Sequence, residues 1–275
     1  MRIFLTGGTG FLGGHFLRLS LKRGCAVTAL CRETQTEPLE HNRNLRWLKA
    51  PLDAVSKSDL SGCDVLVHFA AAGVSPQKAT MDELFRVNLI QSVRLWQDAL
   101  DAGVRRLVIC GSCFEYGRSA ERYERIPADA PLEPVTAYGA SKASATMAAV
   151  ALAAERRCEL AVLRPFSVYG EGQHPSNFWP SLRSAALAGR NYAMTRGEQL
   201  RDFIPAEQVA SRFFDALTAP LPFGLPSIRN VGSGDPVTLR QFAEKWWANF
   251  AAKGRLEIGA LPYRPNEIMR YAPKL

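Results

Sequence analysis

The sequence predicts an α/β protein that combines a Rossmann-type doubly wound parallel sheet with a smaller C-terminal lobe. Over the first 165 residues, short apolar segments alternate with segments of helical periodicity. This pattern is typical of parallel sheets covered by helices on both faces. A glycine-rich stretch joins the first apolar segment to the first helical one. Beyond Pro165 the chain breaks into shorter pieces rich in Pro, Gly and Arg, which indicates an irregular lobe.

The individual elements follow from the spacing of apolar residues. Helices are expected at residues 11–23, 81–100 and 138–155, and an amphipathic helix at 239–250, in which Trp246 and Trp247 serve packing. Strands are expected at residues 2–6, 26–31, 45–48, 64–70, 105–110 and 160–163, and later at 227–231.

Composition narrows the class of protein. The chain has 275 residues, of which 47% are hydrophobic and 22% charged, as in an ordinary globular enzyme. The formal charge of +8 comes from basic residues mixed with acids, without a Lys/Arg run, so we expect a multiply anionic small ligand and no nucleic acid. The first 14 residues show no targeting pattern and no stretch of about 18 apolar residues occurs. We therefore expect a cytoplasmic protein without a membrane segment.

The glycine-rich stretch is the first motif with chemical content. Residues 7–13 read GxxGxxG between the first strand and the first helix. Glycines at these places permit a tight turn, let backbone N–H groups approach a pyrophosphate, and let the helix pack closely on the sheet. A glycine turn without a ligand is the alternative. The position between strand and helix favours a dinucleotide.

The end of the second strand bears on which dinucleotide is bound. The strand ends at Cys31 and is followed by Arg32 rather than by an acid. A carboxylate at this point would bind both ribose hydroxyls of NAD, whereas a guanidinium can bind a 2′-phosphate. Arg32 therefore favours NADP. The alternatives are a solvated Arg32, or Glu33 turned inward to bind the ribose of NAD.

Tyr138 and Lys142 form a YxxxK pair at the start of a predicted helix, where residues four apart share a face. A lysine ammonium beside a phenol stabilises the phenolate, which suits the tyrosine to acid/base work. An isolated YxxxK pair is found as often in an exposed contact that only stabilises the helix as in a catalytic site. Here Ser112 follows the fifth strand, on the edge where ligands bind in open α/β folds.

Taken in order, these motifs resemble the extended short-chain dehydrogenase/reductases, the group that contains nucleotide-sugar 4-epimerases, dehydratases and ketoreductases. The resemblance covers nearly the whole chain, through the glycine turn, the end of the fourth strand, Asn88, the Ser112 segment, the YGASK sequence at 138–142, and the segments 163–170, 201–204, 230–234 and 263–265.

The resemblance implies specific roles. Ser112 would hydrogen-bond the reacting oxygen, Tyr138 would transfer the proton, and Lys142 would hold the nicotinamide ribose and tune Tyr138. The cofactor residues it implies, together with those argued above, are Gly7, Thr9, Gly10, Phe11, Leu12, Gly13, Arg32, Leu52, Phe69, Ala70, Ala71, Asn88, Tyr138, Lys142 and Pro165. The substrate residues it implies are Cys113, Phe114, Ser167, Asn177, Arg201 and Arg264.

It also implies a division of the chain. Residues 1–165 with a returning segment 201–232 would form an NADP-binding Rossmann domain, and residues 166–200 with 233–275 a substrate-binding lobe. The helices at 81–100 and 138–155 would permit a homodimer, as in relatives.

Departures from the family pattern limit the reaction. Cys113 and Phe114 stand where sugar 4,6-dehydratases carry Asp and Glu, so dehydration is disfavoured. Ser167 replaces a common asparagine, and Pro51 replaces a common acid. The segment 113–117 resembles that of deoxysugar 4-ketoreductases of the CDP-abequose and paratose synthase type. We therefore expect an NADP-dependent reductase of a nucleoside-diphosphate 4-ketohexose.

Three other interpretations were weighed. An NAD-dependent nucleotide-sugar 4-epimerase would retain its cofactor and return the hydride to the opposite face of the sugar. A non-catalytic Rossmann protein that senses NADP would not need Ser112, Tyr138 and Lys142 together. A metal site is not expected, because the CxxC at 110–113 has no second pair and the four histidines lack ligand spacing.

Overall fold

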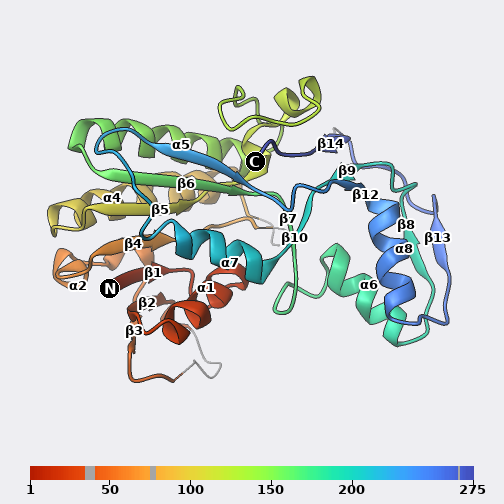
Figure 1. Cartoon of the computed structure of the whole chain (residues 1–275), viewed down its shortest axis with the longest axis horizontal. Helices are drawn as coiled ribbons and strands as arrows, with labels where there is room; N and C mark the ends of the chain where they lie inside the picture. Colours follow the sequence, from red (N-terminus) through yellow and green to blue (C-terminus); the bar gives the residue numbers. More distant parts are fainter. Residues whose placement is uncertain (35–40, 75–78, 266) are drawn as a thin grey trace.

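The computed structural model describes residues 1–34, 41–74, 79–265 and 267–275. Within them the chain builds a sheet of seven parallel strands (Figure 1). From one edge to the other the strands are β11 (Ser227–Val231), β6 (Glu159–Pro165), β5 (Arg106–Cys110), β4 (Val65–His68), β1 (Arg2–Thr6), β2 (Ala26–Cys31) and β3 (Leu45–Lys49). This arrangement confirms the predicted Rossmann-type sheet.

Helices cover both faces of the sheet, which is why its inner strands are mostly apolar and buried. Successive residues of β1 face opposite layers: Ile3 and Leu5 pack under α1 (Phe11–Lys22) and α7 (Ala206–Asp215), while Phe4 packs under α4 (Ser92–Asp101) and α5 (Ala137–Arg156). The two layers are seen from the side in Figure 1. The sheet thus separates two apolar cores and gives the site a rigid base.

Short helices fill the connections between strands and helices. They are η1 (Leu52–Ala54), α2 (Lys57–Leu60), α3 (Met81–Phe85), η3 (Cys113–Glu115) and η4 (Arg118–Arg122). Several of the helices begin at hydroxyl side chains. Thr136 accepts a hydrogen bond from Gly139 N–H at the start of α5, and Ser56 caps α2 in the same way. These caps satisfy backbone donors that the helix itself leaves free.

The expected helix at 81–100 differs from the structure in one respect. Between α3 and α4 lies a π-helix, η2 (Arg86–Gln91). Ser92 donates a hydrogen bond from its hydroxyl to Val87 O, five residues back. A π-turn of this kind inserts one residue into a helix and is often found at functional sites. The strand expected at 64–70 ends at His68, and that expected at 160–163 extends to Pro165.

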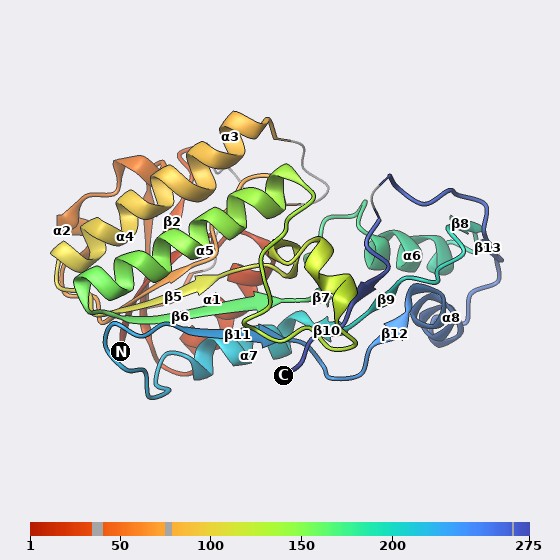
Figure 2. The same ribbon diagram turned by 90° about the horizontal axis from the view of Figure 1, so that it is seen from above.

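The lobe lies beyond the carboxyl ends of the strands (Figure 2). It contains α6 (Phe178–Leu187), α8 (Leu239–Asn249) and short strands in pairs or threes: β7 (Ser167–Tyr169) with β10 (Phe203–Pro205), β8 (Tyr192–Met194) with β13 (Leu256–Ile258), and β9 (Leu200–Arg201) with β12 (Val237–Thr238) and β14 (Arg270–Tyr271).

Aromatic packing holds the lobe together. Trp247 is buried and its indole N–H donates to Gly254 O, while Trp246 contacts Tyr169 and Phe250. This confirms packing as the role of the tryptophan pair. Residues 201–232 contribute α7 and β11 to the layers of the sheet, whereas β9 and β10 pair with strands of the lobe. The domain boundaries themselves stay a prediction. In the described ranges, no helix is long and apolar enough to cross a membrane.

Candidate active site

The predicted functional segments meet at one edge of the sheet. The glycine turn follows β1, residues 69–71 follow β4, and Ser112 follows β5. Since β1, β4 and β5 are parallel neighbours, their carboxyl ends lie side by side. The strand order reverses between β1 and β4, and a crevice at such a point is where open α/β sheets bind ligands.

Two glycines of the turn are required by the fold. Gly7 has φ +72°, and a Cβ there would lie 2.8 Å from Ala70 N. A Cβ at Gly13 would overlap the Gly7 carbonyl oxygen. Gly10 is the N-cap of α1 and brings no side chain that could cap the helix. The free N–H groups at this helix start form a cradle for a phosphate, so the turn fits a dinucleotide.

The other residues predicted to bind cofactor are placed around this turn. Thr9 is exposed, Leu52 opens η1 and is half-buried, and Arg32 is exposed directly after β2. The Phe69 ring packs on Phe213 with ring centroids 4.5 Å apart, so this side chain belongs to the core and only its backbone faces the turn. Ala70 and Ala71 are half-buried, and Pro165 is buried at the end of β6.

His68 ties the ends of β1 and β4 to the π-helix. Its Nδ1 lies 2.9 Å from the Thr6 hydroxyl and its Nε2 lies 3.0 Å from the Ser92 hydroxyl. Because Ser92 donates to Val87 O, it accepts from Nε2–H, and Nδ1 accepts from Thr6. The ring is therefore neutral. Burial, with the charge of Lys142 acting in the same direction, lowers the pKa of His68 from 6.5 to about 3.

Asn88, at the centre of the π-helix, hydrogen-bonds two other segments of the chain. Its Oδ1 accepts from Ala72 N (2.7 Å), and its Nδ2 donates to Ala72 O (3.2 Å) and to the Ser141 hydroxyl (2.9 Å). Ser141 in turn donates to Tyr138 O. These contacts join the segment after β4 to the helix that carries Tyr138. The predicted contact of Asn88 with the cofactor stays a prediction.

The structure brings Ser112, Tyr138 and Lys142 together. Tyr138 lies in the first turn of α5 and Lys142 one turn later, and Lys142 Nζ donates to the Cys110 carbonyl at the end of β5 (2.7 Å). Ser112, two residues beyond Cys110, caps η3 and hydrogen-bonds the Tyr138 side chain. Ser112 and Lys142 are buried, and Tyr138 is half-buried. A hydroxyl, a phenol and an amine thus share one corner of the sheet edge.

The phenol of Tyr138 is held in its neutral form. Burial raises the pKa of Tyr138 above its ordinary value, and the proximity of Cys110, Glu115 and Cys113 adds to this rise, while the hydrogen bond to Ser112 opposes it. A protonated phenol at neutral pH can donate a proton. Burial also raises the pKa of the Cys110 and Cys113 thiols, to about 11 and about 12. Both thiols are therefore neutral neighbours of the phenol.

The wall beside Tyr138 is aromatic. Phe114 is 46% exposed and meets Tyr138 edge to face, with ring centroids 6.3 Å apart. It meets Tyr271 in the same way at 5.7 Å. Cys113, the other residue predicted to contact substrate here, is buried. A ligand that approached the phenol from this side would meet a ring rather than a carboxylate.

The remaining predicted substrate residues lie in or next to the lobe. Arg201 is paired with Glu267 (Nη2 to Oε1, 2.7 Å) and also donates to the carbonyls of Leu200 and Ile268. A ligand that bound this guanidinium would compete with Glu267. Arg264 is exposed. Asn177 is the N-cap of α6, and Ser167 begins β7, half-buried, opposite Phe203.

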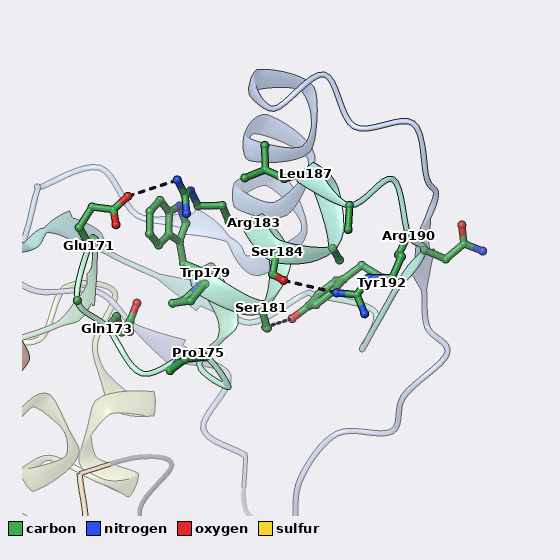
Figure 3. Close-up of a pocket in the computed structure, with 16 residues that line it drawn as sticks. Glu171, Gln173, Pro175, Trp179, Ser181, Arg183, Ser184, Leu187, Arg190 and Tyr192 are labelled. Atoms are coloured by element: carbon green, nitrogen blue, oxygen red, sulfur yellow. Dashed lines mark hydrogen bonds and ion pairs between the residues drawn. The ribbon is translucent and has the colours of Figure 1, made fainter.

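A cavity of about 810 Å³ opens in the lobe (Figure 3). Its walls are the loop 170–175, α6 and residues 188–192. In its wall Gln173 Oε1 and Trp179 Nε1 are buried without a hydrogen-bond partner among the described residues. The lining does not include Ser112, Tyr138 or Lys142, so the cavity is separate from the corner where these three side chains meet.

Sequence reasoning missed a pair of buried charges behind Ser112. Glu115 and Arg164 are 0% and 2% exposed and form an ion pair, with Arg164 Nε 2.7 Å from Glu115 Oε2. The available signal was an arginine within an apolar central strand, because a buried cation requires an anionic partner. Within the described ranges, no group of three or more His, Cys, Asp or Glu could hold a metal ion.

Fold and glycine turn together define a dinucleotide-binding protein of the Rossmann class. The chain belongs to the NAD dependent epimerase/dehydratase family, whose model matches residues 3–232. It is an enzyme of the extended short-chain dehydrogenase/reductase type, as its motifs predicted, with a nicotinamide dinucleotide as cofactor.

Similar proteins within this family differ in what they act on. The chain is 29% identical to a dTDP-6-deoxy-L-talose 4-dehydrogenase (NAD(P)(+)) of Kitasatospora kifunensis, over 88% of this chain and 77% of the relative. It is 32% identical to sterol demethylase protein B of Methylococcus capsulatus, over 95% and 78%. A solved structure of MoeE5 in complex with UDP-glucuronic acid and NAD shares 25% identity, covers 100% of this chain and 90% of that chain, and has a TM-score of 0.87.

Proposed function

We propose that the protein is an NADP(H)-dependent reductase that converts the ketone of a nucleoside-diphosphate 4-ketohexose to an alcohol. The observation that carries the proposal is the arrangement of Tyr138 and Lys142 on one face of α5, beside Ser112 at the carboxyl end of β5. Reduction of a ketone needs a proton donor beside the carbonyl oxygen, and the Tyr138 phenol can supply that proton. Burial raises the pKa of this phenol, and the ammonium of Lys142 would lower it toward the working pH when both groups face the bound cofactor. The similarity to a nucleotide-deoxysugar 4-dehydrogenase supports the same substrate class.

Each residue of the site has a defined part in this proposal. The cofactor, when bound, supplies the hydride that reduces the sugar C4. The glycine turn and the start of α1 would hold its pyrophosphate. Ser112 would bind and orient the carbonyl oxygen, and Tyr138 would donate its proton to that oxygen as the alcohol forms. Lys142, whose ammonium donates a hydrogen bond to Cys110 O in this structure, would bind the ribose and orient Tyr138.

The residues around Tyr138 favour reduction over dehydration. Loss of water from C5 and C6 of a sugar needs an acid and a base beside those carbons. Phe114 offers an aromatic ring at this place, and the raised pKa of Cys113 keeps its thiol neutral. The wall is therefore suited to an unreactive part of the sugar.

An NAD-dependent 4-epimerase is the second candidate, because the same Ser112, Tyr138 and Lys142 could serve a reversible oxidation at C4. A non-catalytic NADP sensor is the third. The grouping of Ser112, Tyr138 and Lys142 at one corner of the sheet edge supports chemistry over sensing. We also propose a cytoplasmic location, in keeping with six cysteines that are all free thiols in the described residues. The homodimer stays a prediction.

The test is a substrate screen with a matched variant. The purified protein is incubated with NADPH and with 4-keto-6-deoxyhexoses carried by CDP, UDP, dTDP or GDP. Loss of NADPH absorbance is followed, and products are identified by mass spectrometry. We expect stoichiometric NADPH consumption with at least one sugar, and a Tyr138→Phe variant that binds NADPH normally but turns over at least about 100-fold more slowly.

Two results would overturn the proposal. Interconversion of UDP-glucose and UDP-galactose without NADPH loss would establish the epimerase instead. Full activity of Tyr138→Phe would show that the phenol takes no part in the reaction.

A further inference from the structure

The turn that carries Ser112 is fixed from behind by one carboxylate. Ser112 N–H donates to Glu115 Oε1 at 2.8 Å, and Ser112 Oγ accepts from Phe114 N–H at 3.2 Å. These two bonds form a reciprocal cap on the short helix η3. The position of Ser112 therefore depends on where the Glu115 carboxylate is held.

Glu115 is held from two other elements of the fold. Its Oε2 accepts from Arg164 Nε on β6 (2.7 Å) and from the Thr146 hydroxyl on α5 (2.9 Å). Glu115 is 0% exposed and Thr146 is 3% exposed, so water does not compete for these bonds. Both carboxylate oxygens are thus engaged, one by the turn and the other by strand and helix.

Thr146 connects this carboxylate to the other two proposed catalytic residues. Tyr138, Lys142 and Thr146 follow one another at intervals of four residues along α5, so they lie on one face of the helix. Through Thr146, Glu115 bonds the helix that presents the phenol and the amine, and through Oε1 it bonds the turn that presents the serine. One side chain therefore links the two halves of the site.

Arg164 completes the support. Its Nη1 donates to the Tyr116 hydroxyl and to Ala128 O, both at 2.9 Å, and its guanidinium carbon lies 4.7 Å from the centroid of the Tyr116 ring. Tyr116 donates to Asn230 Oδ1 on β11. Gly111 permits the close approach of the pair, because a Cβ there would lie 2.9 Å from Glu115 Oε1 and 2.9 Å from Arg164 Cγ.

We propose that Glu115, held by Arg164 and Thr146, is the positioning residue that sets Ser112 in register with Tyr138 and Lys142. The inference rests on the proposed role of Ser112 in the reaction. A buried ion pair is weak evidence for stability, since apolar side chains often pack as well. The hydrogen bonds of Glu115 to the Ser112 turn and to α5 are better explained by the geometry that they impose on the site.

The test uses Thr146→Val, which removes the bond from α5 to Glu115 and leaves the ion pair in place. We expect kcat for the sugar reduced in the substrate screen to fall roughly tenfold, because small displacements of a catalytic group are costly. The KM for the sugar and the affinity for NADPH stay unchanged, and Thr146→Ser restores kcat. Glu115→Gln, which also loses the charge that Arg164 requires, should lower kcat further, roughly 100-fold.

The matched control is Glu159→Gln. Glu159 on β6 pairs with Arg106 on β5 at 2.8 Å, at the amino ends of these strands. Its loss removes a half-buried pair without touching the site, so we expect kcat to stay at the wild-type value. A loss of kcat in Glu159→Gln equal to that in Thr146→Val would overturn the proposal, as would a Thr146→Val enzyme with wild-type kcat.

A second readout does not depend on the substrate. Amide hydrogen exchange of Ser112 reports its bond to Glu115, and we expect Thr146→Val to speed that exchange severalfold while Glu159→Gln does not. Unchanged exchange at Ser112 would overturn the positioning role. If wild-type protein reduces none of the sugars, the proposed function fails, and this exchange measurement alone decides the present inference.

Discussion

Individual side chains at the sheet edge have their protonation state set by the fold. His68 is fully hydrogen-bonded as a neutral ring between Thr6 and Ser92. Tyr138 is held as a neutral phenol beside Ser112. In both cases burial is the main cause, because it disfavours the charged form. The chemistry of the site therefore depends on groups that cannot be assigned their ordinary pKa.

His68 should make the fold sensitive to acid. Its pKa is lowered from 6.5 to about 3, so its contribution to stability is present above pH 6.5 and is lost as pH falls from there toward 3. At ~1.4 kcal/mol per pKa unit, the full effect is roughly 5 kcal/mol. The free energy of unfolding in urea, measured between pH 7 and 4, should fall less steeply for His68→Asn than for wild type.

The comparison of wild type with His68→Asn is made at the same urea concentrations and pH values. Equal slopes for wild type and His68→Asn would show that His68 is not the group that titrates.

Arg32 should determine the choice of cofactor. It is exposed directly after β2, where a guanidinium can bind the 2′-phosphate of NADP. We expect Arg32→Ala to weaken NADPH binding at least about tenfold and to change NADH binding little. Fluorescence titration of both cofactors measures this difference. If the dissociation constant for NADPH were unchanged in Arg32→Ala, NAD would become the favoured cofactor, and Glu33 would be the candidate for binding its ribose.

At the scale of elements, the site depends on two interruptions of regular structure. The first is the glycine turn, where Gly7 and Gly13 let α1 start against β1 and β4. The second is the π-helix η2, which turns Asn88 toward Ala72 and Ser141. Both place backbone or amide groups at the sheet edge that an uninterrupted strand or helix would not supply.

The glycine turn can be tested with two neighbouring positions of α1. A Cβ at Gly13 would overlap Gly7 O, whereas at Gly14 it would meet the end of Arg18 at 3.5 Å and Gly8 O at 3.6 Å, which are ordinary van der Waals distances. We expect Gly13→Ala to abolish NADPH binding or to prevent folding. Gly14→Ala should bind normally and unfold with a free energy higher by up to about 1 kcal/mol. Calorimetry with and without NADPH distinguishes the pair, and normal binding by Gly13→Ala would refute the packing argument.

Most elements could be predicted from the sequence because apolar periodicity reports local structure directly. The strands at 2–6, 26–31 and 227–231 have the predicted bounds. The π-helix could not be predicted, because the apolar spacing over 81–100 fits an ordinary helix. Its causes are contacts with His68 and Ala72, which lie more than ten residues away in the chain.

In the site too, residues within local motifs could be predicted, whereas contacts between distant segments could not. Ser112, Tyr138 and Lys142 were predicted from motifs, and the structure places them in one corner. The pairing of Arg201 with Glu267 could not be predicted, since it depends on how two distant segments of the lobe meet. Glu115 was visible in the sequence, but its role appears only when Thr146 and Arg164 are seen to contact it.

For the whole molecule, the sheet supplies the cofactor turn and the three proposed catalytic residues, and the lobe lies at its carboxyl edge (Figure 2). A ligand between them would have its reacting carbon beside Tyr138 and its remaining groups toward the lobe. The proposed reaction transfers a hydride to a sugar ketone and a proton to its oxygen, and family membership, the Tyr138 phenol and the aromatic wall support it.

The most direct test follows an isotopic label. The protein is incubated with NADPH deuterated at C4 of the nicotinamide, on the face that is transferred, and with the nucleoside-diphosphate 4-ketohexose identified in the screen. Mass spectrometry and NMR then locate the deuterium. We predict one deuterium at sugar C4 per NADPH consumed, and the same labelled product formed at least about 100-fold more slowly by Tyr138→Phe. A sugar product without deuterium, or sugar conversion that consumes no NADPH, would contradict the reductase assignment.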